Sequence, residues 1–335
     1  MLATMKNQEK LSKIASIVSD RSYNLIVMPT EKCNFRCTYC YEDYSVGRMS
    51  PETIQGVKTY IERRMSDSDS FYLSWFGGEP LVARDIVLEI SAHAAEMARK
   101  YTSVKYLGGM TTNGYYLTTS TLADLASVGI FDYQISLDGP REVHNKTRVR
   151  ADGVGTFDRI WENLLAARDS NIPFDITLRC HFDAESHEEL LSLFYDIRKE
   201  FLHDKRFRIY FKSIEKLGGK NDDMLKIAER KEKEKILASL KSLVNDNERI
   251  VSKQEHSVCY ASRPNSLVVR ADGSLAKCTV AFQDPRNSVG TLQQDGTLKI
   301  HQDRLGKWFK GLETLDEDML SCPWSKLATE PHDLV

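Results

Sequence analysis

Three cysteines crowded into one short loop constrain this chain more than any other feature of its sequence. They lie in the segment Cys33-Asn-Phe-Arg-Cys37-Thr-Tyr-Cys40, directly after an apolar run at residues 23–29 that predicts a short buried strand. The cysteines therefore follow the carboxyl end of a strand, where α/β folds collect their ligands. Thiolates commonly ligate iron–sulfur clusters, and three of them leave one iron of a four-iron cluster open to another ligand.

Other uses of these cysteines fit the pattern less well. A structural zinc ion takes four ligands, usually in separated pairs, and this loop offers three. Disulfides need an oxidising compartment, but the first ten residues lack the apolar core of a signal peptide, so we expect a cytoplasmic protein with reduced thiols. Structural cysteines that cluster by chance are the remaining alternative. Cys180, inside a predicted strand, is expected to be a core thiol.

The composition of the chain excludes two classes of partner. Its 335 residues include 46 basic and 48 acidic side chains, for a formal charge of −2, so no positive excess favours nucleic acid or an anionic membrane. No apolar run approaches the roughly 18 residues needed to cross a bilayer. We therefore expect neither nucleic acid nor a membrane as a partner.

Strand and helix patterns alternate through the first two thirds of the chain. Strands are predicted near residues 23–29, 71–76, 105–111, 131–135, 174–180 and 207–212, with helical apolar spacing between them. One helix is predicted to begin at Pro51, because Ser50 is a good N-cap. Six such repeats over residues 23–214 average about 32 residues, near the roughly 31 of one unit in a full (β/α)8 barrel. The predicted fold is therefore an α/β partial (β/α)6 barrel.

The chain is predicted to divide into four parts. Residues 1–22 form an N-terminal arm, and residues 23–214 form the partial barrel. Residues 215–250 form a linker with a charged helix at 226–244, and residues 251–335 form a small α+β C-terminal domain. In that domain Asp272-Gly273, between two apolar runs, predicts a hairpin.

Polar turns follow three of the predicted strands. Gly77-Gly78-Glu79-Pro80 follows the second strand; its glycines permit close backbone approach to a ligand, and its carboxylate can bind an ammonium group. Asn113-Gly114 follows the third strand. Ser136-Leu137-Asp138-Gly139 follows the fourth, with His144 and Arg148 downstream, and these groups suit a ribose and a carboxylate. Taken alone, each turn could equally be an ordinary structural turn.

The cysteine spacing CxxxCx-aromatic-C, with Tyr39 as the aromatic residue, resembles the signature of the radical S-adenosylmethionine (SAM) enzymes. The resemblance extends over nearly the whole chain. It implies that Cys33, Cys37 and Cys40 hold a [4Fe–4S] cluster whose open iron chelates the amino and carboxylate groups of SAM. It also implies that one electron splits SAM into methionine and a 5′-deoxyadenosyl radical, which removes a hydrogen atom from the substrate.

The same resemblance gives roles to the turns after the second and third strands. Gly77, Gly78 and Glu79 match the family's GGEP motif, which binds the SAM amino group. Asn113 lies in a turn similar to the family's third-strand TNG turn, which could also be purely structural. Tyr39 belongs to the expected cofactor-binding set as well.

The turn after the fourth strand resembles the SLDG…HxxxR stretch of family members that carry extra clusters. The resemblance implies that Ser136 and Arg148 contact SAM, and Asp138 joins the expected cofactor-binding residues. His144 and His181 are candidates for the barrel mouth only. No general acid, general base or radical-quenching residue is assigned.

The C-terminal cysteines follow a second family pattern. Cys259, Gly273 and Cys278, in the arrangement CX13GX4C, resemble the opening of the SPASM or twitch extension, which binds auxiliary clusters. Cys322 would be a third ligand, but Ser325 stands where a further CxxC pair would close. The resemblance therefore implies one auxiliary iron–sulfur cluster, with no auxiliary cluster as the alternative.

Family members with this layout mostly modify peptides or proteins. The first interpretation is maturation of a ribosomal peptide by a side-chain cross-link, a thioether or an epimerisation. Alternatives are small-molecule dehydrogenation with one auxiliary cluster, sulfatase maturation, and a non-catalytic cluster-binding scaffold. The expected partners are a peptide substrate and an electron donor of the flavodoxin or ferredoxin type. Because only about 22 residues precede the first strand, a separate leader-binding protein is a further expected partner.

Overall fold

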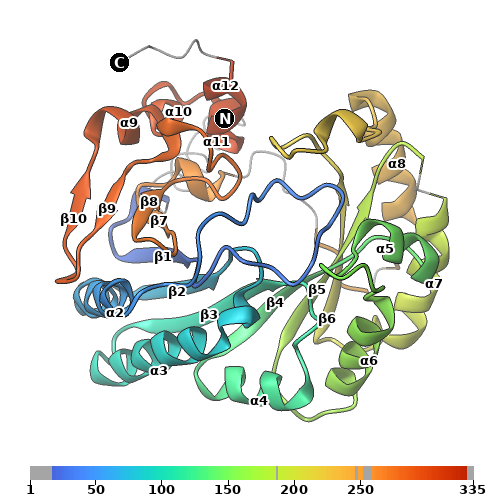
Figure 1. The fold of residues 1–335 in the computed structure, drawn as a ribbon, viewed down its shortest axis with the longest axis horizontal. Coiled ribbons are helices and arrows are strands. Elements are labelled where there is room, and N and C mark those ends of the chain that lie inside the picture. The colour runs from blue at the N-terminus through green and yellow to red at the C-terminus, as the bar shows by residue number, and fades with distance from the viewer. Residues whose placement is uncertain (1–16, 186–187, 246–247, 252–257, 330–335) are drawn as a thin grey trace, which may run out of the picture.

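Six parallel strands form the core of the structure, a computed structural model that describes residues 17–185, 188–245, 248–251 and 258–329. The strands are β1 (Ser22–Val27), β2 (Ser70–Trp75), β3 (Lys105–Thr112), β4 (Ile130–Leu137), β5 (Asp175–Phe182) and β6 (Phe207–Ser213). Each strand pairs in parallel with the next in the chain (Figure 1), and Ile250 forms a parallel bridge with Ile209 of β6. The predicted α/β partial barrel is confirmed.

Helices connect these strands and cover the outer side of the sheet (Figure 1). They are α2 (Pro51–Ser66), α3 (Arg84–Lys100), α4 (Thr119–Ser127), α6 (Phe157–Arg168) and α7 (Glu189–Glu200). Helix α2 begins as predicted, because the Ser50 side chain accepts a hydrogen bond from Thr53 N at 3.2 Å and Pro51 occupies the first turn. Its Val57 and Ile61 are fully buried in the core, so the helical apolar spacing buries one face.

The two faces of the strands differ in chemistry, because side chains alternate along a strand. On β2, Leu73 and Trp75 are fully buried in the apolar core, whereas Tyr72 faces the barrel interior. Asp132 and Arg208 line the same interior cavity, which measures about 340 Å³. The interior of the barrel is therefore polar, in contrast to the side covered by helices.

The C-terminal strands extend the sheet at its other edge. β7 (Ser266–Val269) pairs in parallel with β1, and β8 (Ser274–Ala276), β9 (Gly290–Leu292) and β10 (Leu298–Ile300) follow as antiparallel neighbours. The hairpin predicted around Asp272-Gly273 is confirmed by the pairing of β7 with β8. No local pattern in the sequence predicts the pairing of β7 with β1. The four-part division of the chain stays a prediction, and the sheet runs across its boundary at residue 250.

Further helices complete the described part of the chain. They are η1 (Pro80–Ala83), α5 (Arg141–Thr147), η2 (Asp222–Met224), α8 (Arg230–Ser242), η3 (Tyr260–Ser262), η4 (Pro285–Asn287), α9 (Gln302–Lys307), α10 (Lys310–Thr314), α11 (Glu317–Ser321) and α12 (Pro323–Leu327). Most of the predicted N-terminal arm, residues 1–16, lies outside the described residues. Within the described ranges, no helix is long and apolar enough to cross a membrane.

Helix α8 is shorter than the charged helix predicted over residues 226–244. Residues 225–229 are not helical. The Lys226 carbonyl accepts a hydrogen bond from Ala184 N at 3.2 Å, and the Lys226 ammonium pairs with Glu185 at 2.6 Å. These contacts hold the segment against the end of β5, so the prediction placed the helix start too early. Ile236 and Leu240 form the buried side of α8, as their helical spacing predicts.

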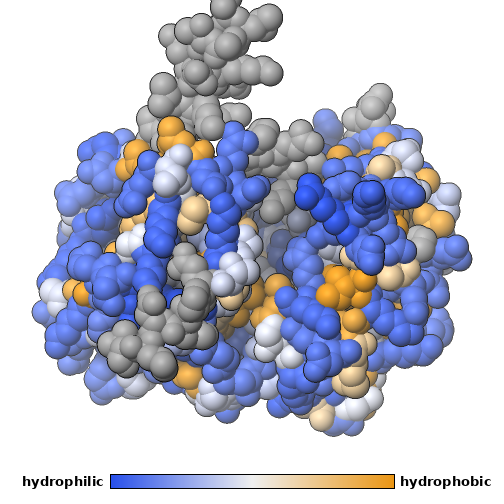
Figure 2. All heavy atoms as spheres, turned by 90° about the horizontal axis from the view of Figure 1, so that it is seen from above, coloured by the Kyte–Doolittle hydropathy of each residue, from blue (hydrophilic) through white to orange (hydrophobic). Residues whose placement is uncertain are grey.

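The surface seen in Figure 2 is hollowed between the part that contains the C-terminal strands and the part that contains α7. Hydrophilic residues dominate this face, and hydrophobic residues gather in small patches. Figure 1 places the C-terminal elements above β1 and β2, on the opposite side of the molecule from α7. The barrel and the C-terminal elements therefore flank one hollowed face.

A buried ion pair connects the start of the cysteine loop to the C-terminal strands. The Arg270 guanidinium, just after β7, donates from Nε and Nη2 to the two carboxylate oxygens of Glu31, both at 2.8 Å. Glu31 is fully buried, and Arg270 also packs over the Phe282 ring with its Cζ atom 4.8 Å from the ring centroid. A bidentate pair fixes the relative orientation of its partners, so this contact holds the approach to Cys33 against the sheet.

Replacing Arg270 with methionine is expected to lower the free energy of unfolding by about 3 kcal/mol, because Glu31 then keeps a buried charge without its partner. The exposed ion pair between Arg141 and Asp158 provides the matched control, and R141M should cost about 0.5 kcal/mol or less. Urea titrations of the reduced, metal-free proteins measure both effects. Equal losses in R270M and R141M would contradict the role assigned to Arg270.

Candidate cofactor site

One pocket at the carboxyl ends of the first strands brings most of the predicted site residues together. Its lining includes all three cysteines of the loop and, from the expected cofactor-binding set, Tyr39, Gly77, Gly78, Glu79, Asn113 and Arg148. Ser136 and Asp138 are buried at the end of β4 outside this lining, and Asp138 reaches it through a hydrogen bond from Tyr39. Nine of the eleven residues expected at this end of the barrel therefore surround one pocket.

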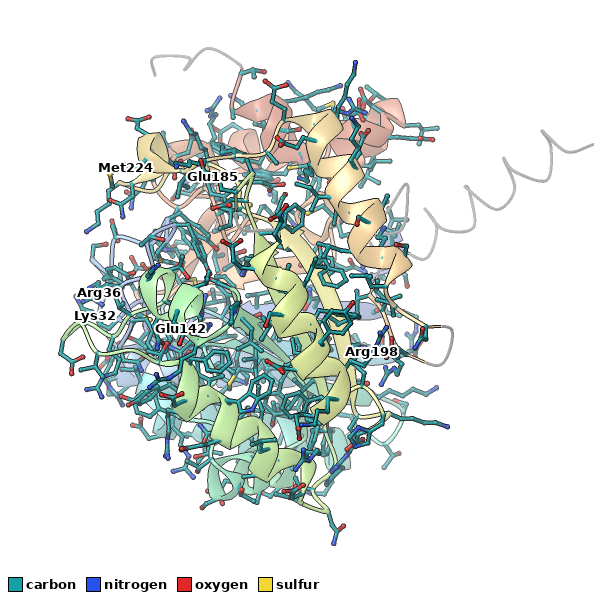
Figure 3. All side chains as sticks on the ribbon, turned by 90° about the vertical axis from the view of Figure 1, so that its right-hand side faces the viewer. Lys32, Arg36, Glu142, Glu185, Arg198 and Met224 are labelled. Carbon is teal, nitrogen blue, oxygen red and sulfur yellow. The ribbon has the colours of Figure 1, made fainter. Side chains whose placement is uncertain are left out.

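The cysteine loop keeps its path by pairing with the segment after α5. Phe35 is fully buried and forms a β-bridge with Arg150, and Arg36 N donates to Val149 O at 2.8 Å. Figure 3 shows Arg36 on the same side of the molecule as Glu142 of α5. The buried aromatic ring and the bridge anchor the middle of the loop, so the cysteines on either side project from a fixed backbone.

The glycines of the turn after β2 permit a contact that no other residue allows. Gly77 has φ = +124°, and a Cβ atom there would lie 2.3 Å from the Thr30 carbonyl oxygen. A Cβ atom on Gly78 would lie 2.4 Å from the Glu31 carbonyl oxygen and 2.6 Å from that of Lys32. The turn therefore packs directly on the backbone that leads into the cysteine loop.

Glu79 is a buried carboxylate that joins the turns after β2 and β3. Its Oε1 atom accepts from Leu81 N at 3.0 Å and from Thr112 Oγ1 at 2.7 Å, and its Oε2 atom accepts from Asn113 N at 2.7 Å. Burial raises the pKa of Glu79, and these donors oppose that shift. A carboxylate oxygen can accept a second hydrogen bond, so Oε2 keeps the capacity to bind a cationic group in the pocket.

Asp138 is the centre of a hydrogen-bond network behind the pocket. Its Oδ2 atom accepts from Tyr39 Oη at 2.7 Å and from Thr147 Oγ1 at 2.9 Å, and its Oδ1 atom lies 2.9 Å from His181 Nδ1. Tyr39 Oη in turn accepts from Arg148 Nη1 at 2.6 Å. Burial by itself raises the pKa of Asp138, but the His181 hydrogen bond and the Arg148 charge hold it well below its ordinary value.

Two neutral histidines support this network. Burial lowers the pKa of His144 to about 3 and that of His181 to about 4. A carboxylate only accepts, so His181 carries its hydrogen on Nδ1. His144 Nδ1 accepts from Asp138 N at 3.4 Å, so its Nε2–H donates to Thr156 Oγ1 at 3.1 Å. Sequence reasoning named both histidines only as mouth candidates and missed Thr147 and Thr156, which no motif distinguishes.

Arg148 presents a buried donor to the pocket. Its side chain is largely buried, and its Nε atom has no hydrogen-bond partner among the described residues. Burial by itself lowers the pKa of Arg148, but the neighbouring Tyr39, Cys37 and Asp138 raise it, so the guanidinium is charged. A buried guanidinium with a free N–H suits an anionic group such as a carboxylate.

The donor set fits an iron–sulfur cluster with SAM. Burial raises the pKa of Cys33, and it raises that of Cys37 to about 11, so cluster binding must displace protons from these thiols. Phe35 N donates to Cys33 Sγ at 3.3 Å, which favours the thiolate form. The same pocket is thus lined by three thiols, by a turn of two glycines and by a guanidinium with a free N–H donor.

The C-terminal cysteines come together at a second place. Cys278 follows β8, and its sulfur accepts hydrogen bonds from the backbone N–H groups of Val280 and Ala281. Burial nevertheless raises the pKa of Cys278 to about 11, and the nearby thiols of Cys259 and Cys322 raise it further. Within the described ranges, no three His, Cys, Asp or Glu side chains converge closely enough to hold a single metal ion.

Side chains around Cys278 and Cys322 hold these loops in shape. Asn287 Oδ1 accepts from Cys278 N at 2.9 Å, and its Nδ2 atom donates to the Cys278 carbonyl at 2.8 Å. Ser325 Oγ donates to the Cys322 carbonyl at 2.8 Å. Cys180, by contrast, lies fully buried in β5 within the apolar core, as predicted for a core thiol.

Comparison with known proteins points to the same chemistry. The family model of the Radical SAM superfamily matches residues 27–194. A cysteine-type anaerobic sulfatase-maturating enzyme of Clostridium perfringens (strain 13 / Type A) is 30% identical over 149 residues, which cover 41% of this chain and 38% of that protein. The chain therefore spans less than half the length of this relative.

Two further proteins resemble the chain over more of its length. A GTP 3′,8-cyclase of Campylobacter jejuni subsp. doylei is 25% identical over 301 residues, 84% of this chain and 87% of that protein. The structure of native anSMEcpe with bound AdoMet and the Cp18Cys peptide superposes with a TM-score of 0.64 at 21% identity, covering 85% of this chain and 80% of that one. At that identity the structural likeness shows a shared fold.

The neutral buried histidines predict a pH-dependent stability. Between about pH 6.5 and 4.5 the unfolded chain protonates residue 144, whereas folded His144, with a pKa of about 3, stays neutral. The free energy of unfolding should therefore fall as pH drops, by up to about 1.4 kcal/mol per pH unit for each such histidine. H144Q should lower the proton uptake that produces this slope by one proton per chain. Urea titrations of the metal-free protein at several pH values measure the slope, and an unchanged slope in H144Q would contradict a neutral His144.

Proposed function

Because this chain belongs to the radical SAM superfamily, we propose that it removes a hydrogen atom from a peptide or protein substrate. It is a radical SAM enzyme, and its cofactors are a [4Fe–4S] cluster and SAM. When bound, these cofactors supply a 5′-deoxyadenosyl radical. The observation that carries the proposal is the single pocket shared by the three loop thiols, the glycine turn and Arg148.

The roles of the pocket residues follow from their chemistry. Cys33, Cys37 and Cys40 hold the cluster as thiolates. Glu79 and the backbone of Gly77 and Gly78 face the ammonium group of SAM, because Oε2 of Glu79 keeps a lone pair and the glycines leave the backbone accessible.

The remaining residues bind or position the other groups of SAM. Arg148 offers its free N–H to the SAM carboxylate. Ser136 and Asp138 are assigned to the ribose of SAM. Asp138 is a positioning residue, because it acts through the hydrogen bond that it accepts from Tyr39. Asn113 orients the approach to the first cysteine, since its Nδ2 atom donates to Asn34 Oδ1 at 2.8 Å and lies 4.0 Å from Cys33 Sγ.

Two findings support a peptide or protein substrate. One relative is a sulfatase-maturating enzyme, and a structure of the same fold holds a bound peptide. The polar cavity of about 340 Å³ in the barrel interior leaves room for a substrate. The reaction class we propose is maturation of a ribosomal peptide by a cross-link, a thioether or an epimerisation, with sulfatase-type protein modification as the alternative within this class.

The proposed reaction needs further components. An external donor of the flavodoxin or ferredoxin type supplies the electron that cleaves SAM. A separate leader-binding protein presents the peptide. A cytoplasmic setting, which keeps thiols reduced, suits the three-thiolate site.

A small-molecule substrate is the second candidate. The GTP 3′,8-cyclase relative matches 84% of this chain, far more than the sulfatase-maturating relative does. A chain with one auxiliary cluster and a polar interior can bind a nucleotide or another polar small molecule in place of a peptide. Both candidate reactions need the 5′-deoxyadenosyl radical. They differ in whether a peptide or a small molecule donates the hydrogen atom.

The cofactor assignment predicts opposite results for two cysteine variants. After anaerobic reconstitution, C37A should lose about four iron atoms per chain, and its formation of 5′-deoxyadenosine from SAM and dithionite should fall to background. C180A should keep both, because Cys180 lies in the apolar core. Iron analysis and chromatography of 5′-deoxyadenosine measure these outcomes. If wild-type protein binds a cluster and SAM but forms no 5′-deoxyadenosine, the enzyme hypotheses are wrong and the non-catalytic scaffold is the hypothesis that remains.

We further propose that Cys259, Cys278 and Cys322 hold one auxiliary cluster. Support comes from the backbone N–H groups of Val280 and Ala281 on the Cys278 sulfur, an arrangement that stabilises a thiolate ligand. The wild-type protein should then contain about eight iron atoms, and the triple variant C259A/C278A/C322A about four. The triple variant should still form 5′-deoxyadenosine. Wild-type protein with about four iron atoms per chain would contradict an auxiliary cluster.

A further inference from the structure

Arg179 is a cation that the assigned roles do not use. It lies on β5, in register with Ser136 of β4 on one side and Tyr210 of β6 on the other. Its side chain lines the pocket that the three loop cysteines also line. It therefore projects from the barrel wall toward the space in which the proposed reaction occurs.

No hydrogen bond or ion pair joins the Arg179 side chain to any described residue, and its Nε atom is buried. Arg208, on the neighbouring strand and facing the same interior, shows the contrast. Its guanidinium lies 2.5 Å from Asp132 and 3.1 Å from Asp175, and it donates to Thr177 at 2.6 Å. Because an N–H donor that is shielded from water is costly without a partner, the buried Nε of Arg179 indicates a ligand.

The surrounding charges do not compensate Arg179. Its positive charge acts on Tyr41, Tyr210 and Lys212 around it. Lys212 is itself a cation that pairs with Glu215 at 2.6 Å, and Glu215 also pairs with Lys233 at 2.5 Å. Two lysines thus share one carboxylate beside Arg179, and Arg179 takes no part in that ion pair. An anionic group would balance this excess.

An acidic residue that lines the same pocket further restricts the chemistry of the ligand. Glu42 lines the pocket, its carboxylate interacts with Glu31 and Arg270, and its Oε1 atom is buried without a described hydrogen-bond partner. A ligand that offers both an acidic group for Arg179 and an N–H donor for Glu42 satisfies both residues. A peptide with a carboxylate carries both groups.

We infer that Arg179 binds a carboxylate of the substrate, so the substrate is a peptide with an acidic group close to the carbon that loses its hydrogen atom. This inference rests on the proposed peptide function. Arginine binds a carboxylate through two parallel N–H donors, and Tyr210 lies beside Arg179 on the neighbouring strand. The carboxylate belongs either to an Asp or Glu side chain or to the C-terminus of the peptide.

Calorimetric titrations of the reconstituted protein with SAM, under anaerobic conditions, test this subsite. The probes are acetyl-Ala-Glu-Ala-amide, its Gln counterpart, the Gln peptide with a free C-terminal carboxylate, and the phosphoserine counterpart. We expect at least one carboxylate peptide to bind about tenfold more tightly than the uncharged Gln amide. Preference for the Glu amide identifies a side-chain carboxylate, and preference for the free acid identifies the C-terminus.

Variants separate the role of Arg179 from a general effect of charge. R179Q should abolish the preference, and R179K should keep part of it because lysine retains the charge without the two-donor geometry. K233Q, which removes a cation already paired with Glu215, should keep the full preference. SAM affinity in R179Q should stay within about twofold of wild type.

Three results would overturn the inference: equal affinity of wild type for acidic and uncharged peptides, tighter binding of the phosphoserine peptide, or loss of SAM binding in R179Q. The third result would assign Arg179 to SAM. None of these readouts depends on radical formation. Failure of the proposed function appears instead as wild-type protein that forms no 5′-deoxyadenosine, so the two failures are distinguishable.

Discussion

Direct contact between two stretches of backbone is the constraint on which the site depends. The turn after β2 lies against the carbonyl groups of Thr30, Glu31 and Lys32, and a Cβ atom on Gly77 or Gly78 would meet these oxygens at 2.3–2.6 Å. The contact lets Glu79 N donate to the Lys32 carbonyl at 3.1 Å. The loop with the three thiols and the turn with the buried carboxylate therefore form one rigid unit. On the far side of that loop, the pair between Glu31 and Arg270 connects the same unit to β7.

The charges around this unit are arranged before any cofactor binds. Asp138 is ionised and receives hydrogen bonds from Tyr39 and Thr147, with His181 as a neutral third donor. Arg148 balances that charge through Tyr39 and keeps one buried N–H free for a ligand. Groups held in this way need little reorganisation when an anionic or cationic ligand enters, which is the usual source of tight and oriented binding in a buried site.

Much of the fold and site could be predicted because the relevant signals are local. Apolar periodicity places the six parallel strands, and the N-cap at Ser50 places the start of α2. The cysteine spacing and the glycine turn identify the two halves of the pocket. The predictions failed where distant contacts decide the outcome. The helix expected from residue 226 starts at Arg230, because Lys226 contacts the end of β5.

The pairing of β7 with β1 and the support that His144 and Thr156 give to Arg148 also depend on contacts between distant segments. Thr156 Oγ1 donates to the Arg148 carbonyl at 2.5 Å, yet nothing in the local sequence distinguishes it from any other threonine before a helix. Arg179 is a similar case. A single arginine in a strand pattern carries no signal, and its importance emerges only from the absence of a described partner in the folded chain.

Electron–nuclear double resonance on the reduced, iron-loaded protein can detect whether SAM binds to the cluster proposed at Cys33, Cys37 and Cys40. With SAM labelled by ¹⁵N in its amino group and by ¹⁷O in its carboxylate, we expect hyperfine coupling from both labels to the cluster. A cluster signal without coupling to either label would show that the pocket holds a cluster that does not bind SAM, and the proposed site would be wrong.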